Sequence, residues 1–401
     1  MKRMLALGAV VWLVAALPCA RAQVHVSKGA GQKSSISLAG FVSGSSAAAT
    51  AFRRTLESDL QRSGWFAVVP GSAEFAIQGS CEDSGASLNV ACRVFETATA
   101  DRYLSKSYRA ESAGARRLAH QVSDEIVYAL TGRKGFASAR LVVVGRKTGH
   151  KELYLCDSDG QGLVQLTRDN SISLAPKWSP DGRLLVYTSY LKRYPDVYAV
   201  EVGSGSRRRL FSFPGLNTCA EIAPNGRDVA VVLSKDGSPE LYAGSLSGGS
   251  PVRITRTPRA AEASPSWSPD GGQIVYVSDQ SGTPQLYITT RDGAAPRRLT
   301  SRGSENVAPD WGSGGLIAFT TRVGGRYQVC VVNPTTLELR QITADDADYE
   351  DPSWAPDGRH IACGRTRQHR SSIYLLDTMG DPPLALLDIP GDWFSPAWSS
   401  K

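Results

Sequence analysis

The side chains that most often carry out catalysis or bind metals are few in this sequence, and they do not cluster. The five histidines lie at positions 25, 120, 150, 360 and 369. There is no His-Glu-x-x-His zinc motif, no Gly-x-Ser-x-Gly nucleophile turn and no complete phosphate-binding loop. We therefore predict no catalytic residues, no metal ligands and no cofactor, and we expect a protein that is not an enzyme.

Two acidic segments contain residue types that bind cations. Asp157-Ser158-Asp159-Gly160 places carboxylates at alternate positions, as a calcium loop does, but it lacks further ligands nearby. The segment lies between two predicted strands, so a hairpin turn is favoured. The acid pairs Asp345-Asp346 and Glu350-Asp351 fall in a predicted loop, where solvation is favoured over binding of a cation or of a basic partner.

A repeated motif organises most of the chain. It reads Trp-Ser-Pro-Asp-Gly in its fullest form, and one copy has lost the Trp. The copies occupy residues 176–182, 221–226, 265–271, 309–312, 352–358 and 396–399, at spacings of 43 to 45 residues. A four-stranded propeller blade has this period, and helical repeats of similar length would not be broken by Pro and Gly.

Each repeat contains the signals of four strands. Asp-Gly or Asn-Gly favours a tight hairpin turn, because glycine adopts positive φ without strain. A β-branched run, a strand with a central Tyr and a short strand ending in Thr follow. The Trp and Tyr residues are predicted to form the core between blades. Residues 395–401 would supply the missing Trp strand to residues 140–167, which gives six blades and a closed ring.

The residues before the propeller do not repeat and predict a small α/β domain, with helices on one sheet. Helices are expected at 47–62, with Phe52, Leu56 and Leu60 in one stripe, and at about 113–130. Gly64 and Gly132 are expected to end these helices. Strands are expected at 36–41, 66–69, 75–79, 88–95 and 102–108. The predicted domains are therefore 23–135 and the six-bladed propeller 136–401, a mainly β fold overall.

The N-terminus has the features of a secretory signal peptide. Lys2-Arg3 precede an apolar run from Met4 to Leu17, and Ala20-Arg21-Ala22 fits a cleavage site. Residues 1–22 would then be removed near Ala22, and the exported chain would start near Gln23, without inserting in a membrane. The formal charge of +7 includes arginine clusters near predicted turns, which favours solvated charges over a nucleic-acid surface.

Six cysteines remain outside the predicted leader. We expect buried free thiols, because a turn near Ser84 would place Cys81 opposite about residue 88 and not opposite Cys92. The other four cysteines fall in different predicted blades, and their spacing matches no metal site.

An exported ring without catalytic residues is most simply a binding platform. Propeller ligands usually meet the rim and the central channel, where loops from successive blades converge. One alternative is an exported propeller enzyme, for which no nucleophile is found. A second alternative is a propeller that binds peptidoglycan or another glycan directly through rim aromatics, namely Tyr190, Tyr194, Trp393 and Phe394.

The overall pattern resembles the TolB family of the periplasmic Tol–Pal system. The most specific likeness is Val122–Phe136, a domain-joining helix and linker, and Phe213-Pro214 and Pro396-Ala397-Trp398-Ser399 are also similar. The resemblance implies a non-enzymatic, monomeric periplasmic adaptor that supports outer-membrane integrity and constriction at cell division. It also implies a propeller rim that binds the peptidoglycan-associated lipoprotein and a free N-terminus that binds TolA.

The resemblance also assigns site residues by position. The lipoprotein site would comprise Leu216, Asn217, Cys219, Ala263 and Ser264. The TolA-binding segment would comprise Gln23, Val24, His25, Val26, Ser27 and Lys28.

Overall fold

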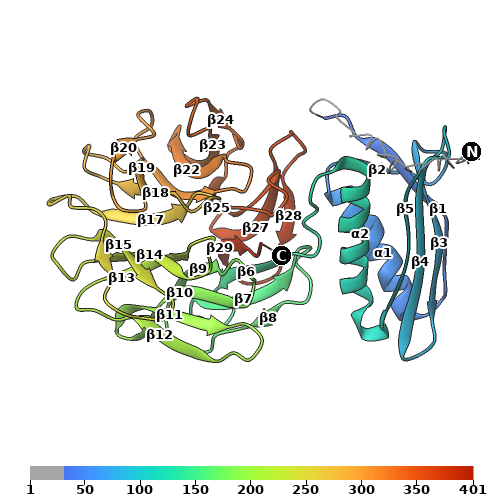
Figure 1. Cartoon of the computed structure of the whole chain (residues 1–401), viewed down its shortest axis with the longest axis horizontal. Coiled ribbons are helices and arrows are strands. Elements are labelled where there is room, and N and C mark those ends of the chain that lie inside the picture. Colours follow the sequence, from blue (N-terminus) through green and yellow to red (C-terminus); the bar gives the residue numbers. More distant parts are fainter. Residues whose placement is uncertain (1–30, 401) are drawn as a thin grey trace, which may run out of the picture.

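The computed structural model describes residues 31–400, which form an α/β domain followed by a six-bladed propeller (Figure 1). The first domain has a five-stranded sheet in the order β2-β1-β3-β4-β5. Two helices lie between this sheet and the propeller (Figure 1). The elements are β1 (Ser34–Ser43), α1 (Ala47–Arg62), β2 (Phe66–Val68), β3 (Phe75–Asp83), β4 (Ser87–Glu96), β5 (Arg102–Glu111) and α2 (Ala115–Thr131).

Local sequence explains where α1 begins and where both helices end. The Ser46 side chain accepts a hydrogen bond from the Ala49 N–H and caps α1. After α1 and α2 the chain turns at Gly64 and Gly132, which adopt φ of 72° and 67°. Phe52 and Leu56 are fully buried against the sheet, so the helical stripe forms the core as predicted.

The propeller consists of six four-stranded antiparallel sheets. In chain order the first three blades are β9 (Ser173–Trp178), β10 (Leu184–Lys192), β11 (Tyr194–Glu201), β12 (Arg207–Phe211); β13 (Asn217–Ile222), β14 (Asp228–Leu233), β15 (Glu240–Ser245), β16 (Val252–Arg253); and β17 (Glu262–Trp267), β18 (Gln273–Ser278), β19 (Gln285–Thr290), β20 (Arg297–Arg298). The next two are β21 (Asn306–Trp311), β22 (Ile317–Val323), β23 (Arg326–Val332), β24 (Leu339–Gln341); and β25 (Asp348–Trp354), β26 (His360–Arg367), β27 (Arg370–Asp377), β28 (Leu384–Leu387).

The sixth blade joins distant parts of the chain. Its strands are β29 (Trp393–Trp398), β6 (Arg140–Gly145), β7 (Glu152–Asp157) and β8 (Val164–Gln165), in that order. The predicted six-bladed propeller preceded by an α/β domain is therefore confirmed.

Two of the repeated Trp residues join neighbouring blades by a hydrogen bond. Trp178 and Trp267 are buried, and their indole N–H groups donate to the backbone carbonyls of Ala397 and Glu221, at 2.9 and 3.1 Å. Each of these carbonyls lies in the preceding blade. The indole therefore stabilises the contact between the two blades by burying apolar surface and by making one hydrogen bond.

The two domains meet at several fixed contacts. The Arg359 guanidinium donates to the Gly64 carbonyl at 3.1 Å and lies over the Trp65 ring at 4.7 Å. The linker is held by Asp124, whose carboxylate accepts from the backbone N–H groups of Ala137 and Ser138, both at 2.8 Å. These contacts define one orientation between the domains.

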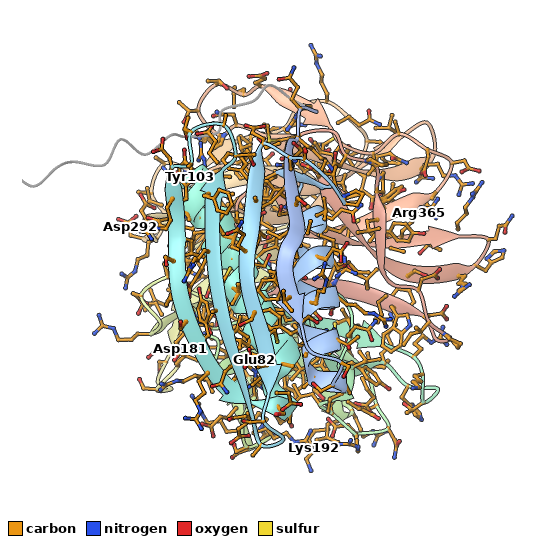
Figure 2. The ribbon with its side chains drawn as sticks, turned by 90° about the vertical axis from the view of Figure 1, so that its right-hand side faces the viewer. Glu82, Tyr103, Asp181, Lys192, Asp292 and Arg365 are labelled. Atoms are coloured by element: carbon orange, nitrogen blue, oxygen red, sulfur yellow. The ribbon has the colours of Figure 1, made fainter. Side chains whose placement is uncertain are left out.

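The outer face of the five-stranded sheet points away from the propeller, and Figure 2 looks onto it. Within this sheet Cys81 is opposite Val90 and Cys92 is opposite Gly79, a register two residues from the expected one. The six cysteines of the described residues are free, and five of them are buried; Cys219 is partly exposed. Across residues 31–400 no helix combines the length and apolar character needed to cross a bilayer.

Candidate functional site

The innermost strand of every blade lines the central channel and contains a bulge at the same place. In each bulge two residues lie opposite one residue of the next strand, and the first of the two is a non-glycine residue with positive φ. These six residues, which we call the channel ring, are Ala175, Cys219, Ser264, Ala308, Asp351 and Ser395, with φ from 43° to 52°.

The channel ring is conformationally costly. Left-handed backbone costs a residue with a Cβ roughly 1 kcal/mol, and in five of the six bulges a proline follows, which restricts the residue before it further. The strain is held by neighbouring blades, because the backbone N–H groups of Cys219 and Asp351 donate to the hydroxyls of Thr188 and Thr320, at 3.2 and 3.1 Å. Strained non-glycine residues that surround a cavity are characteristic of binding sites.

The channel ring surrounds a cavity of about 340 Å³ at one mouth of the channel. Alanine and proline side chains give it apolar walls, while Lys151, Asp351 and the Ser264 and Ser395 hydroxyls add polar groups. The Asp351 carboxylate accepts a hydrogen bond from the Ser395 hydroxyl at 2.6 Å, which joins two neighbouring blades. A cavity of mixed character built from six bulged strands suits recognition of a protein segment that carries both apolar and polar groups.

The floor of the cavity is a charged cluster. Lys177 on β9 lies 2.5 Å from the Asp310 carboxylate on β21 and 3.1 Å from the Glu221 carboxylate on β13. The strands β9 and β21 belong to opposite blades of the six, so the lysine side chain extends across the channel. This lysine lines the cavities at both channel mouths and therefore separates them.

The two carboxylates of the floor also accept hydrogen bonds from the next blades. Glu221 accepts from the Trp267 backbone N–H at 2.9 Å, and Asp310 accepts from the Trp354 backbone N–H at 2.7 Å. Burial raises the pKa of Glu221, and the Lys177 ammonium opposes this effect. Burial likewise tends to lower the pKa of Lys177, but the charges of Asp310 and Glu221 outweigh it and raise that pKa.

The N-terminal domain leaves the channel ring free. It contacts the propeller through Asp159, Arg359 and Asp381, which lie in turns at the ends of strands on the Asp-Gly side of the ring. The second channel mouth, with a cavity of about 310 Å³ beside Pro180 and Pro269, opens on that same side. The channel ring therefore faces solvent on the opposite side.

The structure brings two of the predicted lipoprotein-site residues together. Cys219 and Ser264 both belong to the channel ring and line its cavity. Leu216 and Ala263 are half-buried and pack against the cores of their blades. Asn217 is 1% exposed, and its side chain accepts from the Phe213 N–H and donates to the Phe213 carbonyl, both at 2.8 Å. Its amide thus shapes the loop rather than lining the cavity.

Other predicted residues lie elsewhere. The segment Gln23–Lys28 falls outside the described residues. Of the rim aromatics, Tyr194 is exposed, whereas Trp393 is fully buried and donates its indole N–H to the Ile389 carbonyl. The floor residues were not predicted, although each stands directly before the Trp position of a repeat. Lys151 and the alanines of the channel ring were not predicted either; for the alanines, the Xaa-Pro pair present in five of the six repeats was the available signal.

Comparison with protein families gives one extensive match. Residues 127–401 match the model described as the TolB β-propeller domain. A Tol-Pal system protein TolB from Desulfosudis oleivorans is 34% identical over 185 residues, which cover 46% of this chain and 42% of the relative. A TolB homologue from Chlorobium chlorochromatii is 34% identical over 198 residues, 49% of this chain and 44% of that protein. The matched regions thus span less than half the length of these curated relatives.

The fold is shared over a longer stretch. The crystal structure of TolB from Acinetobacter baumannii superposes with a TM-score of 0.83 at 25% identity, covering 93% of this chain and 98% of that one. A structure described as a putative TolB from Agrobacterium tumefaciens, 21% identical, superposes with a TM-score of 0.51 over 63% of this chain and 90% of that one. With the six-bladed ring, the preceding α/β domain and the family match over the propeller, this chain belongs to the TolB family.

Proposed function

We propose that this protein is a non-enzymatic adaptor of the Tol–Pal system in the periplasm. In this role the channel ring binds the peptidoglycan-associated lipoprotein, and the N-terminal segment Gln23–Lys28 binds TolA. By joining these partners the protein would support outer-membrane integrity and constriction at division. The observation that carries the proposal is the cavity inside the channel ring, which faces away from the N-terminal domain and is therefore open to a partner. Membership of the TolB family supports the same proposal.

The physical argument rests on complementarity. A channel ring held between blades is preorganised, so a partner binds without the cost of ordering this surface. Apolar walls provide burial, while Lys151, Asp351 and the ring hydroxyls select the register of the partner. Among residues 31–400, no histidine lines this cavity.

The lipoprotein arm is tested by calorimetric titration. The protein starting at Gln23 is titrated with the periplasmic domain of the same organism's peptidoglycan-associated lipoprotein. The variant Ala263→Glu places a charge beside the channel ring, and the matched control Ser313→Glu places the same charge beside the other channel mouth. We expect one-to-one binding that Ala263→Glu weakens at least about tenfold and the control leaves unchanged.

No binding by the folded protein, or equal loss in both variants, would refute a lipoprotein site at the channel ring. The TolA arm is tested separately with protein that lacks residues 23–28. This truncation should abolish binding of the TolA C-terminal domain while the lipoprotein titration stays unchanged.

A further inference from the structure

A buried histidine lies where the two domains meet. His120 on α2 is 3% exposed, and its Nδ1 lies 2.6 Å from a carboxylate oxygen of Asp59 on α1. Its other ring nitrogen, Nε2, is buried and has no hydrogen-bond partner. An unpaired buried polar nitrogen costs free energy, so a proton or a ligand that satisfies Nε2 would be stabilising.

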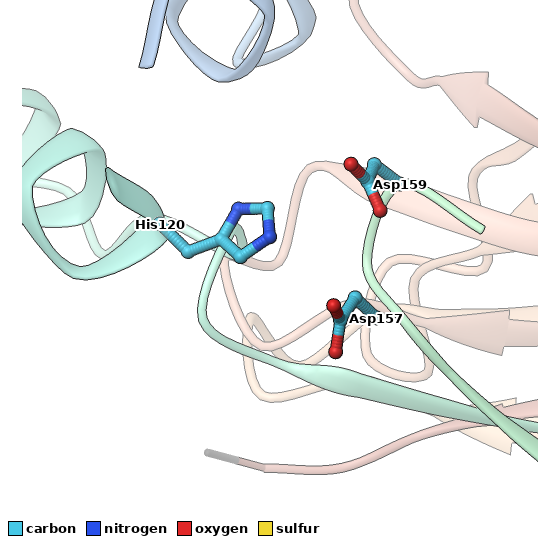
Figure 3. A group of neighbouring side chains, drawn as sticks. All are labelled: His120, Asp157 and Asp159. Atoms are coloured by element: carbon cyan, nitrogen blue, oxygen red, sulfur yellow. The ribbon is translucent and has the colours of Figure 1, made fainter. Parts of the chain in front are cut away.

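The unpaired nitrogen points towards two carboxylates of the propeller. Figure 3 shows the His120 ring with one nitrogen directed to the turn that carries Asp157 and Asp159. The metal-binding atoms of the three residues all lie within 4.8 Å of one another. Asp159 is held in place because its carboxylate accepts from the Gln161 N–H at 3.0 Å. The segment is the hairpin turn that the sequence predicts, and the histidine reaches it from the other domain.

We propose that His120 Nε2 and the carboxylates of Asp157 and Asp159 bind a divalent transition metal, Zn²⁺ by preference. Tetrahedral zinc with bonds of about 2.0–2.2 Å holds its ligand atoms about 3.3–3.6 Å apart, so these atoms would have to move closer together by up to roughly 1.5 Å when the metal binds. An imidazole ligand favours zinc over calcium or magnesium, which prefer oxygen alone. Three protein ligands leave one tetrahedral position for water.

Asp59 completes the arrangement in the way that zinc sites commonly do. A metal-binding histidine usually donates its second ring N–H to a carboxylate, which fixes the tautomer and orients the ring. Asp59 is 4% exposed and occupies that position at Nδ1. With α1, α2 and the β7–β8 turn all contributing, the metal would link the N-terminal domain to the propeller.

An arginine competes for the same carboxylates. Arg116 lies one helical turn before His120 and donates to both oxygens of Asp159, at 2.9 and 2.7 Å, and lies 3.5 Å from Asp157. Zinc would have to displace this guanidinium, whose side chain is 35% exposed and can move into solvent. The competing arrangement is an ion-pair network in which Nε2 of His120 carries a proton. The two arrangements predict opposite effects of removing Arg116.

The test is calorimetric titration of the tagless protein with ZnCl₂ at pH 7.5 after treatment with a chelator. All variants carry His25→Ala, because His25 near the predicted N-terminus is a second candidate ligand. We expect a one-to-one site that His120→Gln weakens by more than about tenfold and that Asp59→Asn weakens by about tenfold. The exposed His369→Gln is the matched control and should bind as the parent does.

Arg116→Gln distinguishes the two arrangements. A metal site loses a competitor and a nearby positive charge, so zinc should bind at least about threefold tighter. Circular dichroism checks that each variant is folded, and zinc should raise the Tm of the parent but not of His120→Gln. The proposal is overturned if the parent shows no saturation below about 100 μM, if His120→Gln binds like the parent, or if Arg116→Gln binds no tighter.

Discussion

Both faces of the propeller contain backbone positions with positive φ, but different residue types occupy these positions on the two faces. On one face the five continuous blades turn through a positive φ at a glycine between their first two strands, as at Gly182, Gly226 and Gly271, with φ of 69° to 71°. On the other face each blade also reaches a positive φ, but at a residue of the channel ring, which carries a side chain. Glycine adopts this conformation freely, whereas alanine, serine and cysteine do not.

This difference in residue type suggests different roles for the two faces: the glycine turns stabilise the fold, and the channel ring offers side chains to a partner. The Asp-Gly turns are hairpins whose only requirement is geometry, so glycine is sufficient there. The channel ring surrounds a cavity, and its side chains form the wall of that cavity. Among the innermost strands and the turns that follow them, the strained non-glycine residues lie on the face where a side chain forms part of the cavity wall, although the outer hairpins of the glycine face also hold Ala295 and Leu337 at positive φ. Four changes, from the largest expected effect to the smallest, test this comparison.

Replacing the lysine of the channel floor should be the most damaging change. Lys177→Met leaves Glu221 and Asp310 without their counter-ion inside the channel, which should lower the free energy of unfolding by about 3 kcal/mol. Urea denaturation at pH 7 measures it. The triple variant with Glu221→Gln and Asp310→Asn should recover most of the loss. A single variant as stable as the parent would contradict a structural role for the charged floor.

The second change concerns Glu262, the first residue of the innermost strand β17. Its side chain is 1% exposed and it precedes Ala263. Burial raises its pKa to about 7. Because the folded-state pKa lies above the ordinary value, this group favours folding at low pH and loses that contribution as pH rises through about 7. Between pH 5 and pH 8, the free energy of unfolding of the parent should therefore fall by about 2 kcal/mol more than that of Glu262→Gln, because glutamine does not ionise.

The measurement is urea denaturation of parent and variant at both pH values. The comparison must be made as a difference, because other groups also titrate in this range. An identical pH dependence in the two proteins would mean that Glu262 is ionised in the folded state.

A matched pair of substitutions tests the two faces directly. Ala308→Gly relieves left-handed strain in the channel ring and should raise the free energy of unfolding by about 0.5 kcal/mol. Gly226→Ala introduces the same strain on the turn face, where a Cβ meets no neighbour within 4 Å, and should lower it by about 1 kcal/mol. Effects of the same sign would remove the distinction between the faces.

The smallest effect is expected from labelling the thiol of the channel ring. Cys219 is the partly exposed cysteine within residues 31–400, so one equivalent of maleimide should react with it under native conditions. The Cys219→Ser variant should stay unlabelled, and its unfolding free energy should change by less than about 0.5 kcal/mol. Mass spectrometry of proteolytic peptides locates the label; modification of Cys156, Cys330 or Cys363 would show that the blades open.

Much of the fold could be predicted, because its signals are local and repeated. Trp-Ser-Pro-Asp-Gly fixes the period and the turn, and the helices of the first domain follow from one apolar stripe and a terminal glycine. The resemblance placed Cys219 and Ser264 at a rim site, and the structure brings both into one cavity. Asn217, by contrast, is turned into its own loop. Sequence position alone does not say which side of a bulge a side chain faces.

The charged channel floor and the His120 cluster could not be predicted, because they depend on closure of the propeller ring and on docking of the two domains. Lys177 meets Asp310 only because six blades close a ring that places opposite strands a side-chain length apart. His120 meets the Asp157–Asp159 turn only because two domains dock in one orientation. Neither distance is encoded in a local pattern, so neither cluster could be found by reading repeats or motifs.

The composite blade also has a consequence for the order of folding. The Arg140 backbone N–H donates to the Ser399 hydroxyl at 2.8 Å, across 259 residues of chain. Contacts between such distant residues form slowly, because the intervening loop must close first. Five blades can each form from one continuous stretch of chain, but the sixth cannot form until β29 is present. Until that strand arrives β6 is an unprotected edge, so the period before ring closure is when the protein is most exposed to mispairing.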